Sequence, residues 1–288
     1  MFPKANGPRM LRLSSRLQGI RVQGWRQLHG AREGVEGLVS AEIVEVKDLT
    51  PSIKELRLCV EGSFNAVNAS NASNAFSFKA GNWVDFFIDQ DGVSKVGGYS
   101  MSSIPSDLPQ LRLAVKSSKH PPAQWCHTLA KPGKRVKLAA GGSFYFDAEE
   151  HGTLKHLVLI AGGIGINPIF SMLKEAYFYR QKLPCLDRVS LFYSASKPSE
   201  LAYRSELQGL ADVWSEKLRV ELRVTRDAGD GWNGACGRLN MEHLRPQLPT
   251  NRNGLLVYLC GPPAMTDQLV GDLERDGLGQ ALRYEKWW

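Results

Sequence analysis

The chain has 288 residues, of which 43% are hydrophobic and 23% are charged. These proportions are typical of a globular protein and exclude an intrinsically disordered chain. Its five cysteines include no Cys-x-x-Cys pair, so neither a disulfide scaffold nor a local zinc or iron–sulfur site is expected, and we predict no metal. No apolar run approaches the roughly 18 residues of a membrane-spanning helix.

The formal net charge of +7 is confined to one end of the chain. Residues 1–32 carry seven Lys and Arg residues and no acid, which leaves 29 basic and 29 acidic residues in the rest. Because the body of the protein is neutral, we expect no nucleic-acid partner.

The Arg-rich segment has the composition of a mitochondrial transit peptide. Met10, Leu13, Leu17 and Ile20 recur at helical spacing, so a helix would carry them on one face. We therefore interpret residues 1–35 as a transit peptide and expect the protein in the mitochondrion, in its matrix. A disordered basic tail is the alternative.

From about Leu38 the pattern predicts short strands separated by Gly or Pro, which indicates a small antiparallel barrel. Residues 61–77 are rich in Asn, Ser and Ala and are interpreted as a surface loop. The predicted strands are Val39–Val46, Ile53–Val60, Trp83–Ile88, Gly98–Ser103, Leu111–Lys116 and Arg135–Ala139.

After about Gly152 the pattern changes to alternating strands and helices, which indicates a doubly wound parallel sheet. The boundary between the two halves is predicted near residues 147–154. The predicted strands are Leu157–Ala161, Val189–Ala195, Leu218–Thr225 and Leu255–Cys260. The predicted helices are Pro168–Gln181, Ser199–Leu210 and Pro263–Glu274, with one helical turn at Met241–Pro246.

A glycine-rich turn joins the first of these strands to its helix, in the order Gly162-Gly163-Ile164-Gly165-Ile166-Asn167-Pro168. Glycines let the backbone approach a pyrophosphate closely, and the helix N-terminus attracts anions. A purely structural tight turn is the alternative. No acid follows the next strand, where Ser194 begins the run Ser-Ala-Ser-Lys, so the ribose 2′-hydroxyl partner typical of NAD sites is missing. Together with Lys197 and Arg204 nearby, this favours NADP weakly.

Three motifs occur in a characteristic order: Tyr99-Ser100, the glycine-rich turn, and a late Tyr258-Leu259-Cys260-Gly261-Pro262-Pro263-Ala264-Met265. Together they resemble the ferredoxin–NADP reductase superfamily over residues 38–288. The resemblance implies a β + α/β fold, with a six-stranded antiparallel flavin-binding barrel (36–150) followed by a doubly wound parallel-sheet NAD(P)-binding domain (151–288).

The same resemblance implies the cofactors, FAD in preference to FMN, and NAD or NADP. Ser100 and Cys260 are the candidate catalytic residues, Ser100 near the flavin N5 and Cys260 beside the nicotinamide. Tyr99 would pack on the flavin, and the terminal Trp288 is a candidate to shield it. The candidate cofactor-binding residues are Tyr99, Ser100, Gly142, Phe144, Gly162, Gly163, Gly165, Asn167, Pro168, Ser194, Cys260, Gly261, Pro262 and Trp288.

Two positions depart from the family pattern. Glycine stands at Gly97, where the family's flavin motif has an Arg that binds a flavin phosphate, so a charge-assisted contact is lost. The second phosphate segment, Gly-x-x-Ser/Thr in the family, is here Pro122-Ala123-Gln124-Trp125.

These features predict a flavin-dependent NAD(P)H oxidoreductase that passes hydride from nicotinamide to flavin, and electrons to an acceptor that the sequence does not identify. A protein is one candidate for that acceptor. The alternative is a non-catalytic dinucleotide-binding regulator or assembly factor that has lost tight flavin binding, because fold alone does not determine function.

Overall fold

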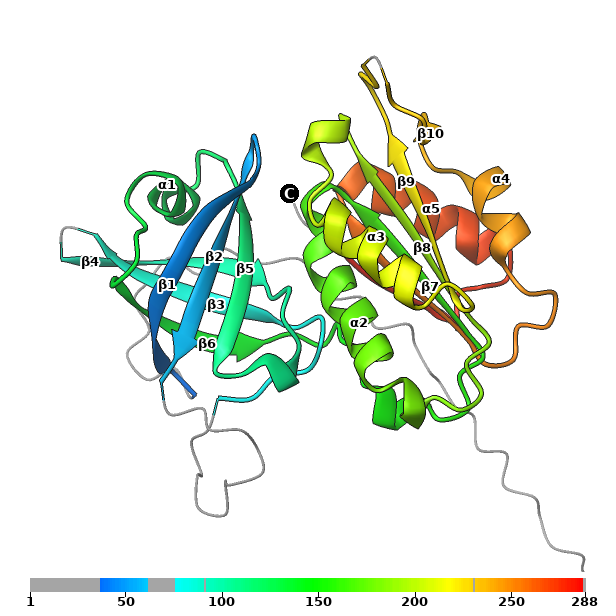
Figure 1. The fold of residues 1–288 in the computed structure, drawn as a ribbon, viewed down its shortest axis with the longest axis horizontal. Helices are drawn as coiled ribbons and strands as arrows, with labels where there is room; N and C mark the ends of the chain where they lie inside the picture. The colour runs from blue at the N-terminus through cyan, green and yellow to red at the C-terminus, as the bar shows by residue number, and fades with distance from the viewer. Residues whose placement is uncertain (1–36, 62–75, 91, 230, 287–288) are drawn as a thin grey trace, which may run out of the picture.

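The structure, a computed structural model, describes residues 37–61, 76–90, 92–229 and 231–286. These residues form two lobes that lie side by side, a barrel followed by an α/β lobe (Figure 1). The predicted transit peptide and the candidate flavin shield Trp288 lie outside the described residues.

The first lobe is an antiparallel sheet of six strands in the order β4-β3-β6-β1-β2-β5. An isolated bridge between Met101 and Leu113 connects the end of β4 to β5, at the two edges of that order. A short helix, α1 (Pro121–Thr128), packs beside the strands. The strands are β1 (Val39–Thr50), β2 (Ile53–Val60), β3 (Trp83–Gln90), β4 (Val93–Ser100), β5 (Gln110–Lys116) and β6 (Arg135–Gly141).

Alternation of apolar and polar residues explains these strands. In β3, Val84, Phe86 and Ile88 are buried in the barrel. The alternate residues Trp83, Asp85 and Phe87 are only partly buried. Successive side chains of a strand point to opposite faces, so this pattern places one face of β3 in the core.

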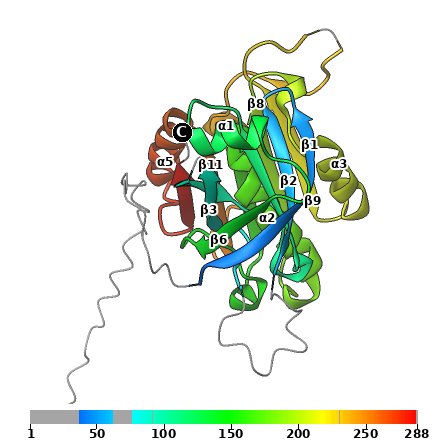
Figure 2. The same cartoon turned by 90° about the vertical axis from the view of Figure 1, so that its left-hand side faces the viewer.

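The second lobe is a parallel sheet in the order β10-β9-β8-β7-β11-β12. Its strands are β7 (His156–Gly162), β8 (Arg188–Ala195), β9 (Leu218–Val224), β10 (Ala235–Cys236), β11 (Leu255–Gly261) and β12 (Leu282–Lys286). The α-helices are α2 (Ile166–Phe178), α3 (Arg204–Val213), α4 (Met241–Leu244) and α5 (Pro263–Arg275). Figure 2 shows α3 and α5 on opposite sides of the sheet, which is therefore doubly wound.

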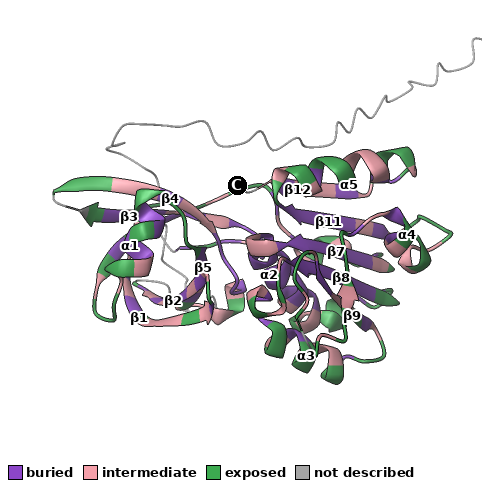
Figure 3. Ribbon diagram, turned by 90° about the horizontal axis from the view of Figure 1, so that it is seen from above, coloured by how far each residue is buried: buried purple, intermediate pink, exposed green. Residues whose placement is uncertain are grey.

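Short 3-10 helices complete the connections. They are η2 (Pro105–Asp107), η3 (Ala148–His151), η4 (Gly163–Gly165), η5 (Arg180–Lys182), η6 (Pro198–Glu200) and η7 (Arg245–Gln247). The central strands β7, β8 and β11 are almost wholly buried, whereas the outer faces of α3 and α5 are exposed (Figure 3). Apolar runs in the sequence mark these strands because parallel strands are covered on both faces.

The predicted β + α/β fold is confirmed, with differences at particular elements. The strand expected at Gly98–Ser103 instead ends at Ser100 and begins at Val93. The helix after the glycine-rich turn begins at Ile166, before Pro168. The elements α1, β10 and β12 were not predicted from the sequence.

Aromatic side chains join the two lobes. The ring of Tyr258, in β11, meets Phe144 edge-on with centroids 5.6 Å apart and meets Phe146 at 6.1 Å. Its hydroxyl donates a 2.9 Å hydrogen bond to the carbonyl of Tyr145. Because rings in this arrangement bury large areas, the segment between the lobes is part of the core.

Candidate functional site

The predicted nucleotide site lies where the order of the parallel strands reverses. The strand β7 lies between β8, which follows it in sequence, and β11, which comes much later. In open α/β sheets, ligands bind outside the carboxyl ends of the strands at such a switch point. The glycine-rich turn follows β7, and Cys260, Gly261 and Pro262 end β11 or follow it, so the fold brings the two motifs together.

Gly162 and Gly165 of the glycine-rich turn pack closely against neighbouring residues, whereas Gly163 has open space beside it. A Cβ atom on Gly165 would lie 2.6 Å from the carbonyl carbon of Cys260 and 2.8 Å from the nitrogen of Gly261. A Cβ atom on Gly162 would lie 2.9 Å from Cδ of Pro262. Gly163, in contrast, has a φ of +54° and nothing within 4 Å of its Cβ position. The turn therefore presents bare backbone at Gly163, which is the shape that a pyrophosphate needs.

The first turn of α2 is hydrogen-bonded to the barrel. Asn167 is 2% exposed, and its Nδ2 donates a 2.8 Å hydrogen bond to the carbonyl of Ala114 in β5. Its Oδ1 accepts a longer bond, 3.4 Å, from the hydroxyl of Tyr203. Pro168 follows and is also buried. The side chain of Asn167 is thus engaged between the lobes, and its predicted cofactor contact stays a prediction.

Cys260 is fully buried at the end of β11. Burial, reinforced by the nearby carboxylate of Glu285, raises the pKa of its thiol well above the usual value. Because only a thiolate is an effective nucleophile, we expect this buried cysteine to be neutral and unreactive at neutral pH.

Met265 lies beside the ends of these strands, and no role was predicted for it from the sequence. Its sulfur lies 3.8 Å from the hydroxyl of Ser194 and 3.4 Å from the Cβ position of Gly261. The Ser194 hydroxyl also donates a 3.4 Å bond to the carbonyl of Ala161. Met265 therefore contacts residues at the ends of β7, β8 and β11. Its position at the end of the late motif is the sequence feature that could have identified it.

Two neighbouring residues of β4 carry the predicted flavin contacts, and they point to opposite faces. Ser100 is 5% exposed and lies opposite Trp83 in β3. Tyr99 lies opposite Val84 and packs edge-on against Phe86, with centroids 5.8 Å apart. The hydroxyl of Tyr99 is buried without a hydrogen-bond partner in the described part of the chain, and burial raises its pKa.

Trp83 was not singled out from the sequence, although it lies between two predicted site residues. It pairs with Ser100 on one side and with Gly141 on the other. A Cβ on Gly142, whose φ is +105°, would lie 2.8 Å from its indole ring. Ser100, Trp83 and Gly142 are thus neighbours, whereas Phe144 is 3% exposed and packs on Tyr258 between the lobes.

No space is left at Gly97 for the side chain that the family pattern has there. A Cβ atom on Gly97 would lie 2.9 Å from Cβ of Pro122 and 2.9 Å from both Cε2 and the hydroxyl of Tyr99. Contacts this short are essentially never seen for a real Cβ. The ring of Tyr99 and the start of α1 therefore close over this position.

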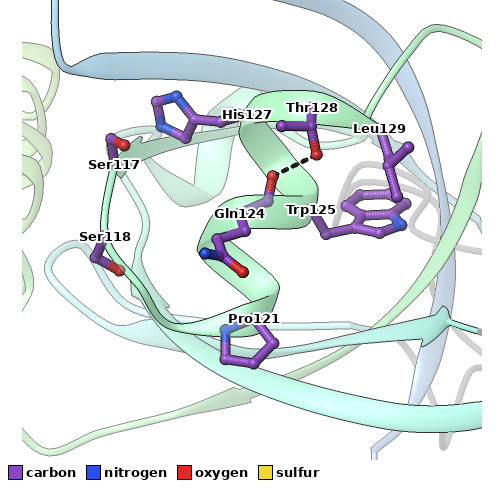
Figure 4. Close-up of a pocket in the computed structure, with 8 residues that line it drawn as sticks. All are labelled: Ser117, Ser118, Pro121, Gln124, Trp125, His127, Thr128 and Leu129. Atoms are coloured by element: carbon purple, nitrogen blue, oxygen red, sulfur yellow. Dashed lines mark hydrogen bonds between the residues drawn. The ribbon is translucent and has the colours of Figure 1, made fainter.

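A hollow of about 350 Å³ lies along α1. Figure 4 shows Gln124 and His127 on the helix, with Ser117 and Ser118 on the segment that precedes it. Its lining residues are Ser117, Ser118, Pro121, Gln124, Trp125, His127, Thr128 and Leu129. None of them is a Lys or an Arg, so the hollow offers polar groups without a permanent positive charge.

The residues that favoured NADP have partners within the protein. The ammonium group of Lys197 lies 3.4 Å from the carboxylate of Asp227, and the guanidinium of Arg204 lies 5.2 Å from the ring centroid of Trp232. Asp227 thus places a carboxylate near the end of β8, where the residues that directly follow β8 include none. The preference between NAD and NADP stays a prediction.

Comparisons with known proteins agree with this architecture. The pattern of the oxidoreductase NAD-binding domain matches residues 159–270. The chain is similar to a solved ferredoxin NADP+ reductase from Neisseria gonorrhoeae with bound FAD and NADP. That structure has a TM-score of 0.70 and 21% identity, over 88% of this chain and all of the other. The two-domain fold is therefore that of the ferredoxin–NADP reductase superfamily.

Two curated relatives are more similar in sequence, and both are named oxidoreductase NAD-binding domain-containing protein 1. The relative from Homo sapiens is 37% identical over 265 residues, 86% of this chain and 80% of the relative. The relative from Danio rerio is 34% identical over 264 residues, 87% of this chain and 92% of the relative. The chain belongs to this family of NAD-binding oxidoreductases within the superfamily.

Proposed function

We propose that the protein is a flavin-dependent NAD(P)H oxidoreductase. The observation that carries this proposal is the direct contact between α2, the helix that follows the glycine-rich turn, and the barrel lobe. Asn167 binds the carbonyl of Ala114, and the hydroxyl of Ser171 donates a 2.6 Å hydrogen bond to the carbonyl of Ser103. Ser103 comes three residues after Ser100, so the helix that follows the predicted pyrophosphate turn meets the predicted flavin segment at one seam between the lobes.

The residues at this seam have separate tasks in the proposal. The open backbone at Gly163 holds the dinucleotide pyrophosphate, and Cys260 borders the nicotinamide as a neutral thiol. Ser100 and Trp83 form the wall on the barrel side. A flavin bound at this wall supplies the redox chemistry by accepting the hydride, and the protein supplies orientation and the exclusion of water.

The residues fit a flavin in part. The buried hydroxyl of Tyr99 lacks a partner in the described part of the chain, and a polar atom of a bound group would remove the cost of leaving it unsatisfied. The closed position at Gly97 does not fit a flavin diphosphate. The latter observation favours the second candidate function, a dinucleotide-binding regulator without a catalytic flavin.

Anaerobic absorption spectroscopy tests the proposal. The protein is mixed with flavin and then with NADH or NADPH, and bleaching of the flavin band is expected. A folded protein that binds dinucleotide but bleaches no flavin would support the regulator instead. Ser100→Ala is expected to slow the bleaching, and an unchanged rate would remove Ser100 from the mechanism.

We also propose that residues 1–35 direct the protein to the mitochondrial matrix, on the basis of their Arg-rich, acid-free composition. A fluorescent protein carrying this segment should enter mitochondria. Replacing its arginines with glutamate should leave the fusion in the cytosol.

A further inference from the structure

The barrel strand β4 and the helix α1 pack directly on each other where the family pattern places a flavin phosphate. Gly97 has no side chain, and Cβ of Pro122 and the ring of Tyr99 lie 2.9 Å from the place where one would begin. Restoring an arginine there would require both neighbours to move. The gap between strand and helix is thus filled by protein atoms.

The N-terminus of α1 is also poor in hydrogen-bond donors. A helix normally presents unpaired N–H groups in its first turn, and these groups attract phosphate. Here Pro121 and Pro122 occupy the first two positions and have no N–H. The N–H of Gln124 is already bound to the carbonyl of His120 at 3.0 Å. Only Ala123 contributes an N–H from the first three residues.

Lys119 comes two residues before this helix, but neither the residue directly before the helix nor the lining of the hollow is a Lys or an Arg. The residue before the helix is His120, and burial lowers its pKa, so its ring is neutral at neutral pH. The hollow along α1 has no Lys or Arg in its lining. A flavin diphosphate would therefore meet neither an arginine, nor a full set of helix N–H groups, nor a charged imidazole.

The part of the site that would meet the flavin ring and its ribityl chain is different. Ser100 and the partly exposed Trp83 lie side by side on the face of β4 opposite to Tyr99. These are neutral groups of the kind that recognise a ring edge and an alcohol. Neutral side chains therefore stand where a flavin ring would lie, whereas the place of the flavin phosphates is closed.

We propose that the protein binds flavin through its riboflavin portion alone and uses it as an exchangeable substrate, which makes it a reductase of free flavins. This inference rests on the function proposed above and names its acceptor. NAD(P)H gives the oxidised flavin one hydride, which carries two electrons and one proton. The flavin takes one further proton from water. The products are NAD(P)+ and the two-electron-reduced flavin, which leaves the protein.

Affinities for riboflavin, FMN and FAD test the proposal without requiring turnover. Quenching of flavin fluorescence on the full chain is expected to give three dissociation constants within about threefold of one another, because the phosphates add no contact. Flavin should be lost on desalting. A dissociation constant for FAD at least about tenfold below that for riboflavin, or FAD retained at one equivalent, would overturn the proposal.

Salt dependence gives a second readout that needs no variant. Binding of FMN and FAD should be as insensitive to ionic strength as binding of riboflavin, because salt screens contacts between phosphate and a cation. Lys95, two residues before Gly97 on the same strand, is the nearest alternative cation in sequence. Lys95→Ala should leave all three affinities unchanged, and a selective loss for FMN and FAD would contradict the proposal.

Turnover separates a failure of this inference from a failure of the proposed function. With excess riboflavin and NAD(P)H in the absence of oxygen, many equivalents of reduced flavin per protein molecule are expected. Reduction of a single bound equivalent of FAD would overturn the free-flavin proposal and leave the oxidoreductase intact. Reduction of no flavin by a protein that binds dinucleotide would overturn both.

Discussion

The side chain of Asn167, in the first turn of α2, donates its hydrogen bond to the main-chain carbonyl of Ala114 in the other lobe. The distance is 2.8 Å, and both residues are buried. A carbonyl in a strand cannot move without moving the strand. The glycine-rich turn, which ends one residue before α2, is therefore held in a fixed position relative to the barrel.

This bond can be tested by replacing Asn167 with Asp, because a carboxylate cannot donate to the carbonyl of Ala114. We expect the free energy of unfolding to fall by about 2–3 kcal/mol, since a buried polar pair is left unsatisfied. Chemical denaturation measures this change. If stability is unchanged while the dissociation constant for NAD(P)H rises about tenfold, the side chain binds nucleotide instead.

Gly165→Ala tests the close approach of the turn to β11. The new methyl group would lie 2.6 Å from the carbonyl carbon of Cys260, so the two strand ends must separate. We expect a loss of about 1–3 kcal/mol in the free energy of unfolding, together with weaker dinucleotide binding. Gly152→Ala is the matched control, because nothing lies within 4 Å of its Cβ position and its φ is negative. Equal effects of the two substitutions would contradict the packing argument.

Glu175, on α2, makes stability depend on pH. It is 6% exposed, and its Oε2 has no hydrogen-bond partner in the described part of the chain. Burial is the largest cause that raises the pKa of Glu175 from 4.5 to about 7. Asp147, Asp107 and Glu149 raise it further, while Lys182 opposes them. The pKa of Glu175 is higher in the folded protein than in the unfolded chain, so protonation of this carboxyl favours the folded state. This contribution to the free energy of unfolding is fully present below pH 4.5 and is lost as the pH rises through about 7.

Glu175→Gln should therefore remove this dependence. At about pH 8 the variant is expected to be more stable than the parent protein by about 1–2 kcal/mol, a value reduced to allow for solvent screening. At about pH 4 the two proteins should be equally stable, because the carboxyl is then protonated in both states. Denaturation curves at the two pH values measure the difference. A constant difference across this range would show that Glu175 does not titrate as described.

Thiol labelling tests the neutral state of Cys260. Cys185 and Cys236 are exposed, whereas Cys260 is fully buried and its pKa is raised. Iodoacetamide at about pH 8 should modify the two exposed cysteines in the folded protein, and Cys260 only after denaturation. Mass spectrometry of the labelled peptides distinguishes them. Rapid modification of Cys260 in the native state would make it a reactive thiol.

Local patterns predicted most of the fold. The runs that became β2, β7 and β11 are apolar or alternating, and such runs are specified by their own residues. The edge strands β10 and β12 were not predicted, because β10 has only two residues and β12 alternates charged with apolar residues. Edge strands depend on the neighbour with which they pair, which a local pattern does not contain.

The nucleotide half of the site was more predictable than the flavin half. Gly165 lies so close to the backbone of Cys260 and Gly261 that no side chain fits there. A glycine is therefore required at this position, and its presence could be recognised in the sequence. The closure of Gly97 by Tyr99 and Pro122 joins residues from two separate elements, and only the missing arginine hinted at it. The approach of Asp227 to Lys197 likewise depends on the pairing of β8 with β9, in which Ala195 lies opposite Val224.

The hydrophobic core of the α/β lobe does not stop at the seam. Ile53 and Ala114 of the barrel belong to the same buried cluster as Phe170 and Leu173 of α2. Cutting the chain between the lobes would therefore expose apolar surface on both pieces. We therefore expect the two lobes to unfold in a single cooperative transition, and neither lobe to be stable without the other.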